Sequence, residues 1–253
     1  MDYSRQLALL DPSQIGKKSV AIIGVGATGS YVALQLAQMG WGNSVQGQGT
    51  MKVWDGDIVE EHNLVNQAYD RSHIGMPKVM ALADVIMRKC GFTIETHNEM
   101  VTNQNDVRST YVFLLTDTMA SRKDIFKNVL QYSFTTDLVI ETRMGIDKGR
   151  VYAFDPNNPV EVEEWQKTLY DDDQAEVSAC GASASIIPTV YNLASRAVWR
   201  LIHHFDLKYG KEYLKRGEAT APKVLSELQF VFPECVAADG EHYDHMYRQF
   251  KSI

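Results

Sequence analysis

The chain has 253 residues, of which 45% are hydrophobic, and this is enough to bury one sizeable core. Its formal net charge of −7 argues against a nucleic-acid-binding surface, because phosphate binding normally needs a basic face. No apolar run is long enough to cross a membrane, and residues 1–6 lack the layout of a secretory signal, so we expect a cytoplasmic protein that does not enter the membrane.

The cysteines are odd in number and far apart, which makes a disulfide framework unexpected. They are Cys90, Cys180 and Cys235, and no two of them are spaced as CxxC. We therefore expect a reducing compartment and no structural zinc site.

Apolar runs alternate with helical spacings along the chain. Strands are predicted at residues 19–23, 51–55, 112–115, 138–141 and 149–154, and helices at 30–39, 78–89, 121–130 and 186–204. The first run, SVAII, is typical of a strand buried on both faces of a parallel sheet. The alternation predicts an α/β fold with a Rossmann-like wound, mostly parallel sheet, helices on both faces and an antiparallel C-terminal extension.

Two later segments carry weaker signals. Residues 161–176 are acidic and polar, and we interpret them as a surface crossover, while residues 226–232 (SELQFVF) alternate like a strand. No linker marks a second domain, so the chain is predicted to be one domain over 1–253, with a nucleotide-binding core at 1–155, a crossover at 156–185 and a C-terminal helix and strands at 186–253.

A glycine motif joins the first strand to the first helix. Gly24 allows a tight turn, Gly26 lets the backbone approach a phosphate, and Gly29 lets the helix pack closely on the strand. Asp55 ends the next strand, where an acid accepts hydrogen bonds from the ribose hydroxyls of an adenosine. These features predict a nucleotide site, and they suit NAD and ATP equally.

Further stretches resemble, in order and spacing, the motifs of the ThiF/MoeB and ubiquitin-activating enzyme family. Residues 55–67 (DGDIVEEHNLVNQ) resemble D-x-D-x-V-x-x-x-N-L-x-R-Q, residues 74–78 (IGMPK) resemble IG-x-x-K, and residues 116–122 (TDTMASR) resemble TD-x-x-x-x-R. Residues 3–6 (YSRQ) resemble the N-terminal RY-x-RQ. Cys180, followed by residues 187–194 (IPTVYNLA), resembles the C-x-x-x-G…P…G…A helix entry.

The resemblance implies ATP-dependent adenylation of a carboxylate, with ATP and Mg²⁺ bound, because two anions must be brought together. It implies that Lys78 contacts the phosphates, that Asp117 holds Mg²⁺, and that Arg5 reaches the γ-phosphate of the partner subunit in a homodimer. Taken alone, Lys78 would be a surface helix start and Arg5 part of a loose terminus. The nucleotide-binding positions that the resemblance implies are Gly24, Gly26, Gly29, Asp55, Asp57, Asn63, Gln67 and Lys78.

One position departs from the family pattern. Asn66 stands where the family has an arginine, and an amide supplies neither the charge nor the bidentate fork of a guanidinium. We consider three other arginines as substitutes, namely Arg71, Arg122 and Arg143. Cys180 has two interpretations, as a nucleophile that takes the activated acyl group or as a small buried residue.

Three functions follow as hypotheses. The leading one is adenylation of the C-terminal glycine of a ubiquitin-like or sulfur-carrier protein with a Gly-Gly tail. An NAD-dependent oxidoreductase would share the glycines and Asp55 but would give no reason for Lys78 or Asp117. A non-catalytic member that binds nucleotide or a ubiquitin-like protein is favoured by Asn66.

Overall fold

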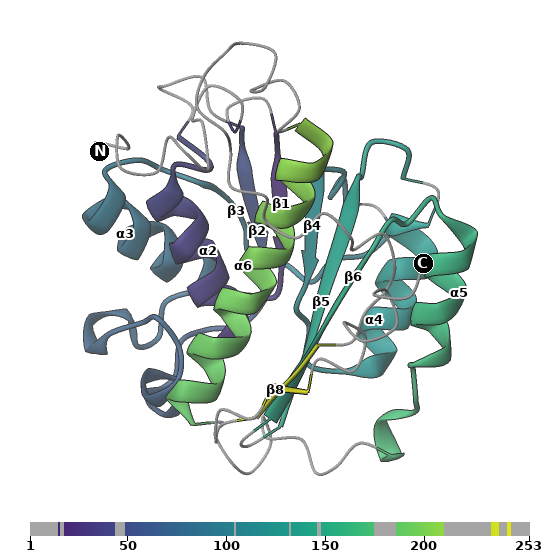
Figure 1. Ribbon diagram of the computed structural model, residues 1–253. Helices are drawn as coiled ribbons and strands as arrows, with labels where there is room; N and C mark the ends of the chain where they lie inside the picture. Colours follow the sequence, from purple (N-terminus) through teal and green to yellow (C-terminus); the bar gives the residue numbers. More distant parts are fainter. Residues whose placement is uncertain are drawn as a thin grey trace.

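The computed structural model describes residues 15, 18–43, 49–103, 105–131, 133–145, 148–174, 186–209, 234–237 and 242–243. The described strands form one eight-stranded sheet in the order β3-β2-β1-β4-β5-β6-β7-β8. Figure 1 shows this sheet with α6 lying along one of its faces. In chain order the strands are β1 Val20–Ile23, β2 Met51–Trp54, β3 Glu95–His97, β4 Tyr111–Leu114, β5 Leu138–Met144, β6 Lys148–Phe154, β7 Glu234–Ala237 and β8 His242–Tyr243.

The type of strand pairing changes once across the sheet, from parallel to antiparallel at β5. Strands β3, β2, β1, β4 and β5 run parallel, and β6, β7 and β8 continue the sheet in antiparallel pairs. The predicted Rossmann-like sheet with an antiparallel C-terminal extension is therefore confirmed. The predicted strand at 226–232 lies outside the described residues.

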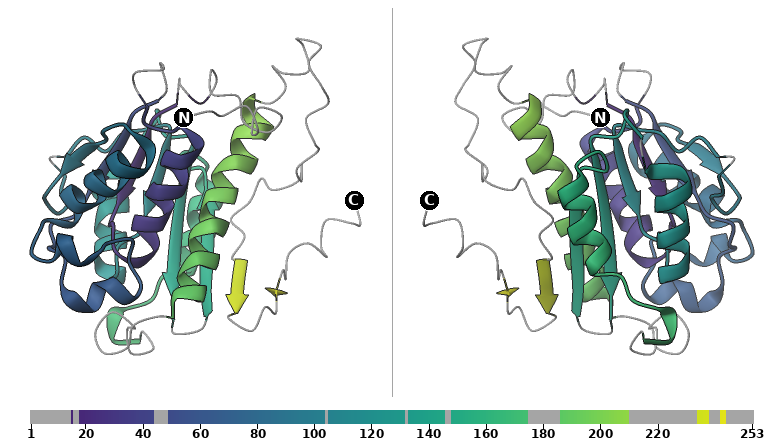
Figure 2. Two further views of the ribbon diagram at one scale, coloured as in Figure 1. Left: turned by 90° about the vertical axis from the view of Figure 1, so that its left-hand side faces the viewer. Right: turned by 90° about the vertical axis from the view of Figure 1, so that its right-hand side faces the viewer.

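Helices cover both faces of the sheet. They are α2 Ala27–Met39, α3 Lys78–Cys90, α4 Met119–Ile125, α5 Pro159–Lys167 and α6 Ile187–Tyr209, with short helical turns at η3 Glu61–Val65, η4 Arg71–His73 and η6 Asp172–Gln174. The two side views show α6 and α4 on opposite sides of the strands (Figure 2). No helix in the described ranges has both the length and the apolar character needed to cross a membrane.

The side chains of β1 alternate between two hydrophobic cores, one on each face of the sheet. Val20 and Ile22 of β1 belong to the core packed under α2, α3 and α6, whereas Ala21 and Ile23 belong to the core under α4 and α5. Successive side chains on a strand point to opposite faces, so a strand apolar at every position is covered on both sides. The strand Val20–Ile23 is therefore buried on both faces as predicted, while Ser19 before it is only partly buried.

Helix ends follow local chemistry. α2 begins at Ala27, three residues before the predicted start, with Gly26 at its N-cap. It ends at Met39, and its C-cap is Gly40, whose φ of 102° is left-handed and whose N–H donates to carbonyls of the last turn. The predicted helix at 121–130 is two pieces, α4 and a π-helical turn, Phe126–Leu130.

The segment 161–176, interpreted as a polar surface crossover, contains part of a helix that was not predicted, because α5 occupies Pro159–Lys167. Asn158 caps this helix by accepting a hydrogen bond from the amide of Val160 at 3.1 Å, and Pro159 is its first residue. Trp165 is fully buried, with its ring stacked 4.8 Å from that of Phe154. The acidic composition of residues 161–176 gave no indication that Trp165 faces the core. Strand β3 was also missed, since its residues are polar.

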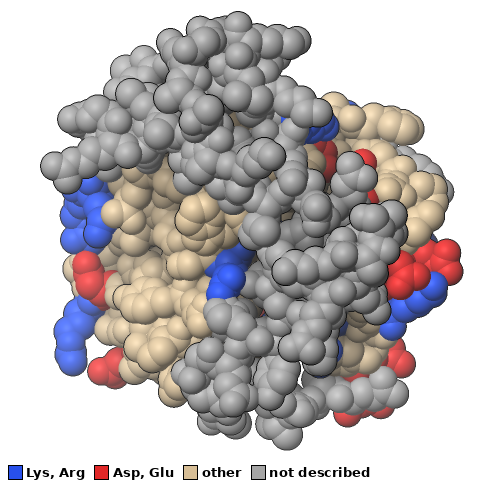
Figure 3. Space-filling model, in the orientation of Figure 1, with Lys and Arg blue, Asp and Glu red and all other residues tan. Residues whose placement is uncertain are grey.

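The face that carries α2 and α6 is mostly uncharged where the structure describes it (Figure 3). Acidic and basic side chains gather toward its edges, near α3 on one side and α5 on the other, and one basic patch lies near the middle.

Candidate functional site

A cavity of about 920 Å³ lies at the carboxyl ends of β1, β2 and β4. The strand order reverses here, since β1 pairs with β2 on one side and with β4 on the other. Ligands of open α/β sheets bind at such switch points. Residues from the glycine motif and from the motifs at 55–67, 74–78 and 116–122 line the cavity, namely Gly24, Gly26, Asp55, Asp57, Asn63, Gln67, Lys78 and Asp117. The motif at 187–194 does not line it.

The three glycines of the turn differ in what a side chain would meet at each position. Gly24 has a φ of +90°, and a Cβ there would lie 2.7 Å from the carbonyl oxygen of Leu115. A Cβ on Gly29 would lie 2.0 Å from the carbonyl oxygen of Gly24, so Gly29 packs the helix on the turn and does not line the cavity. A Cβ on Gly26 would have nothing within 4 Å. The open space above the backbone at Gly26 is where a ligand can approach.

Asp55 fixes the glycine turn from the end of β2. Its Oδ2 accepts a hydrogen bond from the amide of Val25 at 2.8 Å, and its Oδ1 accepts one from the amide of Asp57 at 2.9 Å. The residue is 8% exposed. Each carboxylate oxygen keeps a lone pair for another donor, so Asp55 can still accept bonds from a ligand.

Lys78 is the first residue of α3 and is buried at the cavity wall. Its Nζ lies 2.8 Å from Oδ2 of Asp57, whose side chain is 54% exposed. Pro77 precedes it, which is consistent with a helix start at this point. The ammonium is thus held at the cavity by a partner that water also reaches.

Residues of the η3 loop close another side of the cavity. Asn63 is buried, and its Oδ1 accepts a hydrogen bond from the amide of Glu60 at 2.9 Å. Asn66 is also buried and lines the cavity. The Oε1 of Gln67 and the Oγ1 of Thr116 are buried without a hydrogen-bond partner among the described residues. Gln67 and Thr116 both line the cavity.

Asp117 follows β4 and is exposed at the cavity. Helix α4 begins two residues later, with Thr118 as its N-cap. Asp172 accepts hydrogen bonds from the amides of Met119 and Ala120, at 2.6 and 3.0 Å. These bonds, more than the charges of nearby basic residues, lower the pKa of Asp172. Asp172 therefore holds the start of α4, which directly follows the loop that carries Asp117.

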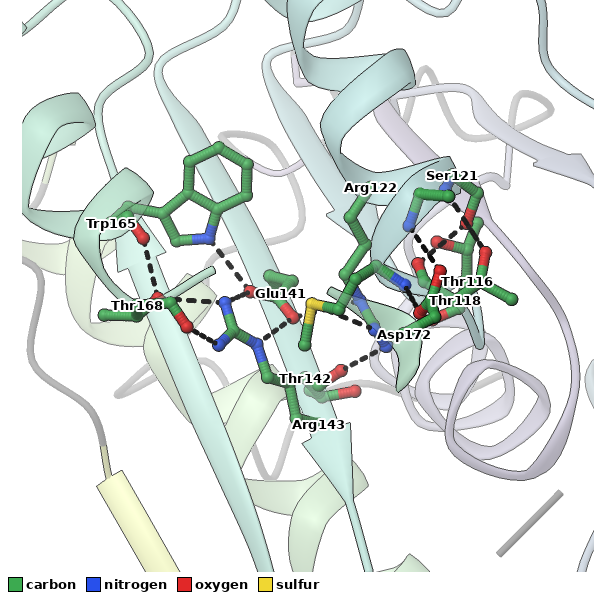
Figure 4. Close-up of polar contacts among 12 residues, drawn as sticks. Thr116, Thr118, Ser121, Arg122, Glu141, Thr142, Arg143, Trp165, Thr168 and Asp172 are labelled. Atoms are coloured by element: carbon green, nitrogen blue, oxygen red, sulfur yellow. Dashed lines mark hydrogen bonds and ion pairs between the residues drawn. The ribbon is translucent and has the colours of Figure 1, made fainter. Parts of the chain in front are cut away.

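A fully buried carboxylate, Glu141 of β5, holds two of the arginines that we considered as substitutes for the missing one (Figure 4). Arg143 donates to both of its oxygens at 2.8 Å, and Trp165 donates to Oε2 at 2.9 Å. The Nε of Arg122 lies 3.0 Å from Oε1, as an ion pair without the alignment of a hydrogen bond.

The other contacts of these arginines are structural as well. Arg122 donates to the carbonyl oxygens of Thr116 and Thr142, and Arg143 donates to the carbonyl oxygen of Thr168 at 2.6 Å. Burial lowers the pKa of Arg122. Neither arginine lines the cavity, and neither does Arg71. The idea that one of them replaces the missing guanidinium is therefore not supported by this geometry.

The described lining of the cavity is rich in acids. Lys78 is the one lysine or arginine among the described lining residues. The acidic ones are Asp55, Asp57, Glu60, Glu99, Asp117 and Asp124. A polyanionic ligand would need further positive charge here, from a metal ion or from another segment or subunit.

Two predicted site residues, Arg5 and Cys180, lie outside the described residues. Sequence reasoning missed Trp54 and Thr116, which both line the cavity. A signal for them existed, because each directly precedes a predicted site acid at the end of a parallel strand.

Short regions of the chain are similar to known proteins. The uncharacterized protein y4oA of Sinorhizobium fredii is 36% identical over 81 residues, which are 32% of this chain and 12% of that protein. Ubiquitin-like modifier-activating enzyme 5 of Caenorhabditis briggsae is 33% identical over 111 residues, 41% of this chain and 24% of that protein. The matched regions thus span a quarter or less of these curated relatives.

Solved structures share the fold over nearly the whole chain. A structure of PaaA matches with a TM-score of 0.63 at 18% identity, covering 95% of this chain and 71% of that one. MccB of Escherichia coli with ATP matches with a TM-score of 0.62 at 13% identity, covering 94% of this chain and 68% of that one. The model of the ThiF family matches residues 3–230, and the chain therefore belongs to the ThiF family.

Proposed function

We propose that this chain transfers the AMP moiety of ATP to a carboxylate and releases pyrophosphate. One observation carries the proposal: separate motifs of the family meet at one cavity. The glycine turn, Asp55, Lys78 and Asp117 come from four distant segments, and all of them line it. An NAD-dependent oxidoreductase would need only the glycine turn and Asp55.

The cavity has features that fit ATP. Asp55 keeps acceptor capacity for ribose hydroxyls, and the backbone at Gly26 is open to a phosphate. MccB, which shares this fold, has been solved with ATP, and this supports ATP as the nucleotide.

The fit of Mg²⁺ rests on the type of donor. No group of three or more metal-ligating side chains occurs among the described residues. Mg²⁺ that accompanies a nucleotide needs only one or two carboxylates, since phosphates and water supply the other ligands. Asp117 is an exposed carboxylate in the cavity, and we propose that it holds the ion. When bound, Mg²⁺ would neutralise charge on the phosphates.

In the proposed reaction an oxygen of the carboxylate attacks the α-phosphorus of ATP. A new P–O bond forms the acyl adenylate, the bond to the β-phosphate oxygen breaks, and its electron pair leaves with pyrophosphate. Lys78 would leave Asp57 for the phosphates and stabilise the charge that builds up on them. Asp57 would stay solvated, because half of its side chain is already exposed.

For the carboxylate we propose the C-terminal glycine of a ubiquitin-like or sulfur-carrier protein with a Gly-Gly tail. The similarity to ubiquitin-like modifier-activating enzyme 5 supports this class. MccB has been solved in complex with N-formylated MccA. A small peptide is the first alternative substrate to test. We further propose a single adenylating domain over 1–253 that works in the cytoplasm.

The shortage of cations supports a composite site. With Lys78 as the one lysine or arginine of the described lining, a homodimer in which Arg5 of the partner subunit reaches the γ-phosphate would supply the missing charge. Cys180 remains a proposed acceptor of the acyl group after adenylation.

The test is ATP–pyrophosphate exchange with Mg²⁺, run with Gly-Gly-ending carriers and with peptides. We expect exchange that depends on one substrate class and is lost in Asp117→Asn. Glu163→Asn serves as a control, since Glu163 lies on α5 and pairs with Lys167 on the surface. ATP binding without exchange on any substrate would favour the non-catalytic alternative that Asn66 suggests. Binding of NADH in place of ATP would favour the oxidoreductase.

A further inference from the structure

Tyr69 is a buried phenol beside the glycine turn, 6% exposed, and the proposed chemistry does not use it. Its hydroxyl donates a hydrogen bond to the carbonyl oxygen of Val25 at 2.6 Å. The amide of the same Val25 donates to Asp55 at 2.8 Å. Val25 lies between Gly24 and Gly26, so both of its backbone polar groups are held by side chains from other segments.

Tyr69 is itself held in place from α3. Its ring meets the ring of His73 edge-on, with centroids 6.3 Å apart. His73 is 1% exposed, and its Nε2 lies 2.9 Å from Oδ2 of Asp84 on α3. Its Nδ1 accepts a hydrogen bond from the amide of Asp70 at 3.1 Å. A series of contacts thus runs from α3 to the glycine turn.

The phenol stays protonated and can act as a donor at any ordinary pH. Burial, and then the negative charges of Asp55 and Asp57, raise the pKa of Tyr69 well above its usual value. A carbonyl oxygen needs a donor, so this state is the one that the contact requires.

We propose that Tyr69 is a positioning residue that fixes the Val25 peptide and so sets the backbone at Gly26 for the phosphates of the nucleotide. The inference rests on the proposed function, because it assigns the open side of Gly26 to phosphate. A bond from the phenol is well suited to this task, since the turn must keep a shape in which Gly24 has a φ of +90°.

The experiment compares Tyr69→Phe with wild type and with Tyr31→Phe by calorimetric titration of ATP and of adenosine. Phenylalanine keeps the ring and removes one donor, which leaves the Val25 carbonyl unsatisfied. Tyr31 is the matched control, because its hydroxyl donates to the backbone carbonyl of Gln67 at 3.2 Å and not to the Val25 peptide. Thermal unfolding of each variant shows that it is folded.

We expect the Kd of Tyr69→Phe for ATP to rise roughly three- to tenfold, and its Kd for adenosine to change less than about twofold. Tyr31→Phe should leave both values near those of wild type. Unchanged ATP affinity in Tyr69→Phe, or equal losses for ATP and adenosine, would overturn the inference and leave the proposed function standing. If wild-type protein binds neither ligand, the proposed function fails, and the inference fails with it.

Discussion

The Nζ of Lys78 lies 2.8 Å from Oδ2 of Asp57 at the wall of the cavity, and the two residues differ sharply in exposure. The lysine side chain is 10% exposed and the aspartate side chain 54% exposed. A partner that is half in water can lose the ammonium at little cost, because solvent replaces it. The ion pair therefore keeps the ammonium of Lys78 at the cavity, and a phosphate can still compete with Asp57 for it.

Lys78→Met tests whether this ammonium serves a nucleotide. The apolar side chain keeps the length and packing of lysine, so we expect the free energy of unfolding to change little. The Kd for ATP should rise roughly 10- to 100-fold, the loss of a charge-assisted hydrogen bond to phosphate. Titration calorimetry measures it. Lys123→Met is the control, since Lys123 pairs with Asp171 at 2.7 Å and does not line the cavity. Equal ATP affinity in the two variants would contradict a phosphate role for Lys78.

The glycines of the turn separate binding from folding. Alanine at Gly26 meets nothing within 4 Å, so Gly26→Ala should fold with nearly wild-type stability and yet bind ATP at least about tenfold more weakly, because the methyl group occupies the phosphate approach. Alanine at Gly29 would collide with the carbonyl of Gly24. Gly29→Ala should therefore lose stability, by about 1–3 kcal/mol. Urea unfolding and ATP titration of both variants give the answer, and a Gly26→Ala variant that binds ATP normally would argue against phosphate at this turn.

The parts of the fold and site that the sequence predicts are those whose pattern lies within one short stretch of the chain. Strand β1, the glycine turn and Asp55 were predictable because a short apolar run and a fixed spacing carry their geometry. The grouping of Lys78 with Asp117 came from the family resemblance, since no periodicity relates two segments that meet only in the folded sheet.

Long-range contacts account for what was missed. Helix α5 is acidic along the sequence, and only the contact of Trp165 with Glu141 and Phe154 shows that one side of it is core. For the same reason, nothing in the sequence indicated that Arg122 and Arg143, two of the arginines considered as substitutes, are already paired with a buried carboxylate. Their partner, Glu141, lies 19 residues after Arg122 in the chain and two residues before Arg143, on a strand that reads as apolar.

Glu141→Gln should be among the most destabilising conservative changes in this chain. The carboxylate is fully buried and neutralises Arg122 and Arg143, so its replacement leaves buried guanidinium charge uncompensated. We expect a loss of about 3–5 kcal/mol in the free energy of unfolding. The exposed pair of Glu163 and Lys167 offers a matched control, for which Glu163→Gln should cost less than about 0.5 kcal/mol. Chemical denaturation of both proteins measures the difference, and similar values for the two would refute a central role for Glu141.

Acid should destabilise the fold through two histidines of α6. Burial, and then Arg200 and Arg196, lower the pKa of His203 to about 4, and burial, followed by Lys208, lowers that of His204 to about 4. The ordinary value of histidine is near 6.5, so between pH 6.5 and 4 the unfolded chain binds protons that the folded chain does not. Stability is therefore complete above pH 6.5 and falls as the pH drops toward 4.

The slope is bounded by about 1.4 kcal/mol per pH unit for each group, and we expect less because both side chains are partly exposed. Urea unfolding at several pH values in this window measures it. The double variant His203→Asn/His204→Asn cannot take up these protons, so its stability should fall less steeply than that of wild type over the same range. Parallel curves for the two proteins would show that carboxylates elsewhere in the chain, and not these histidines, set its acid sensitivity.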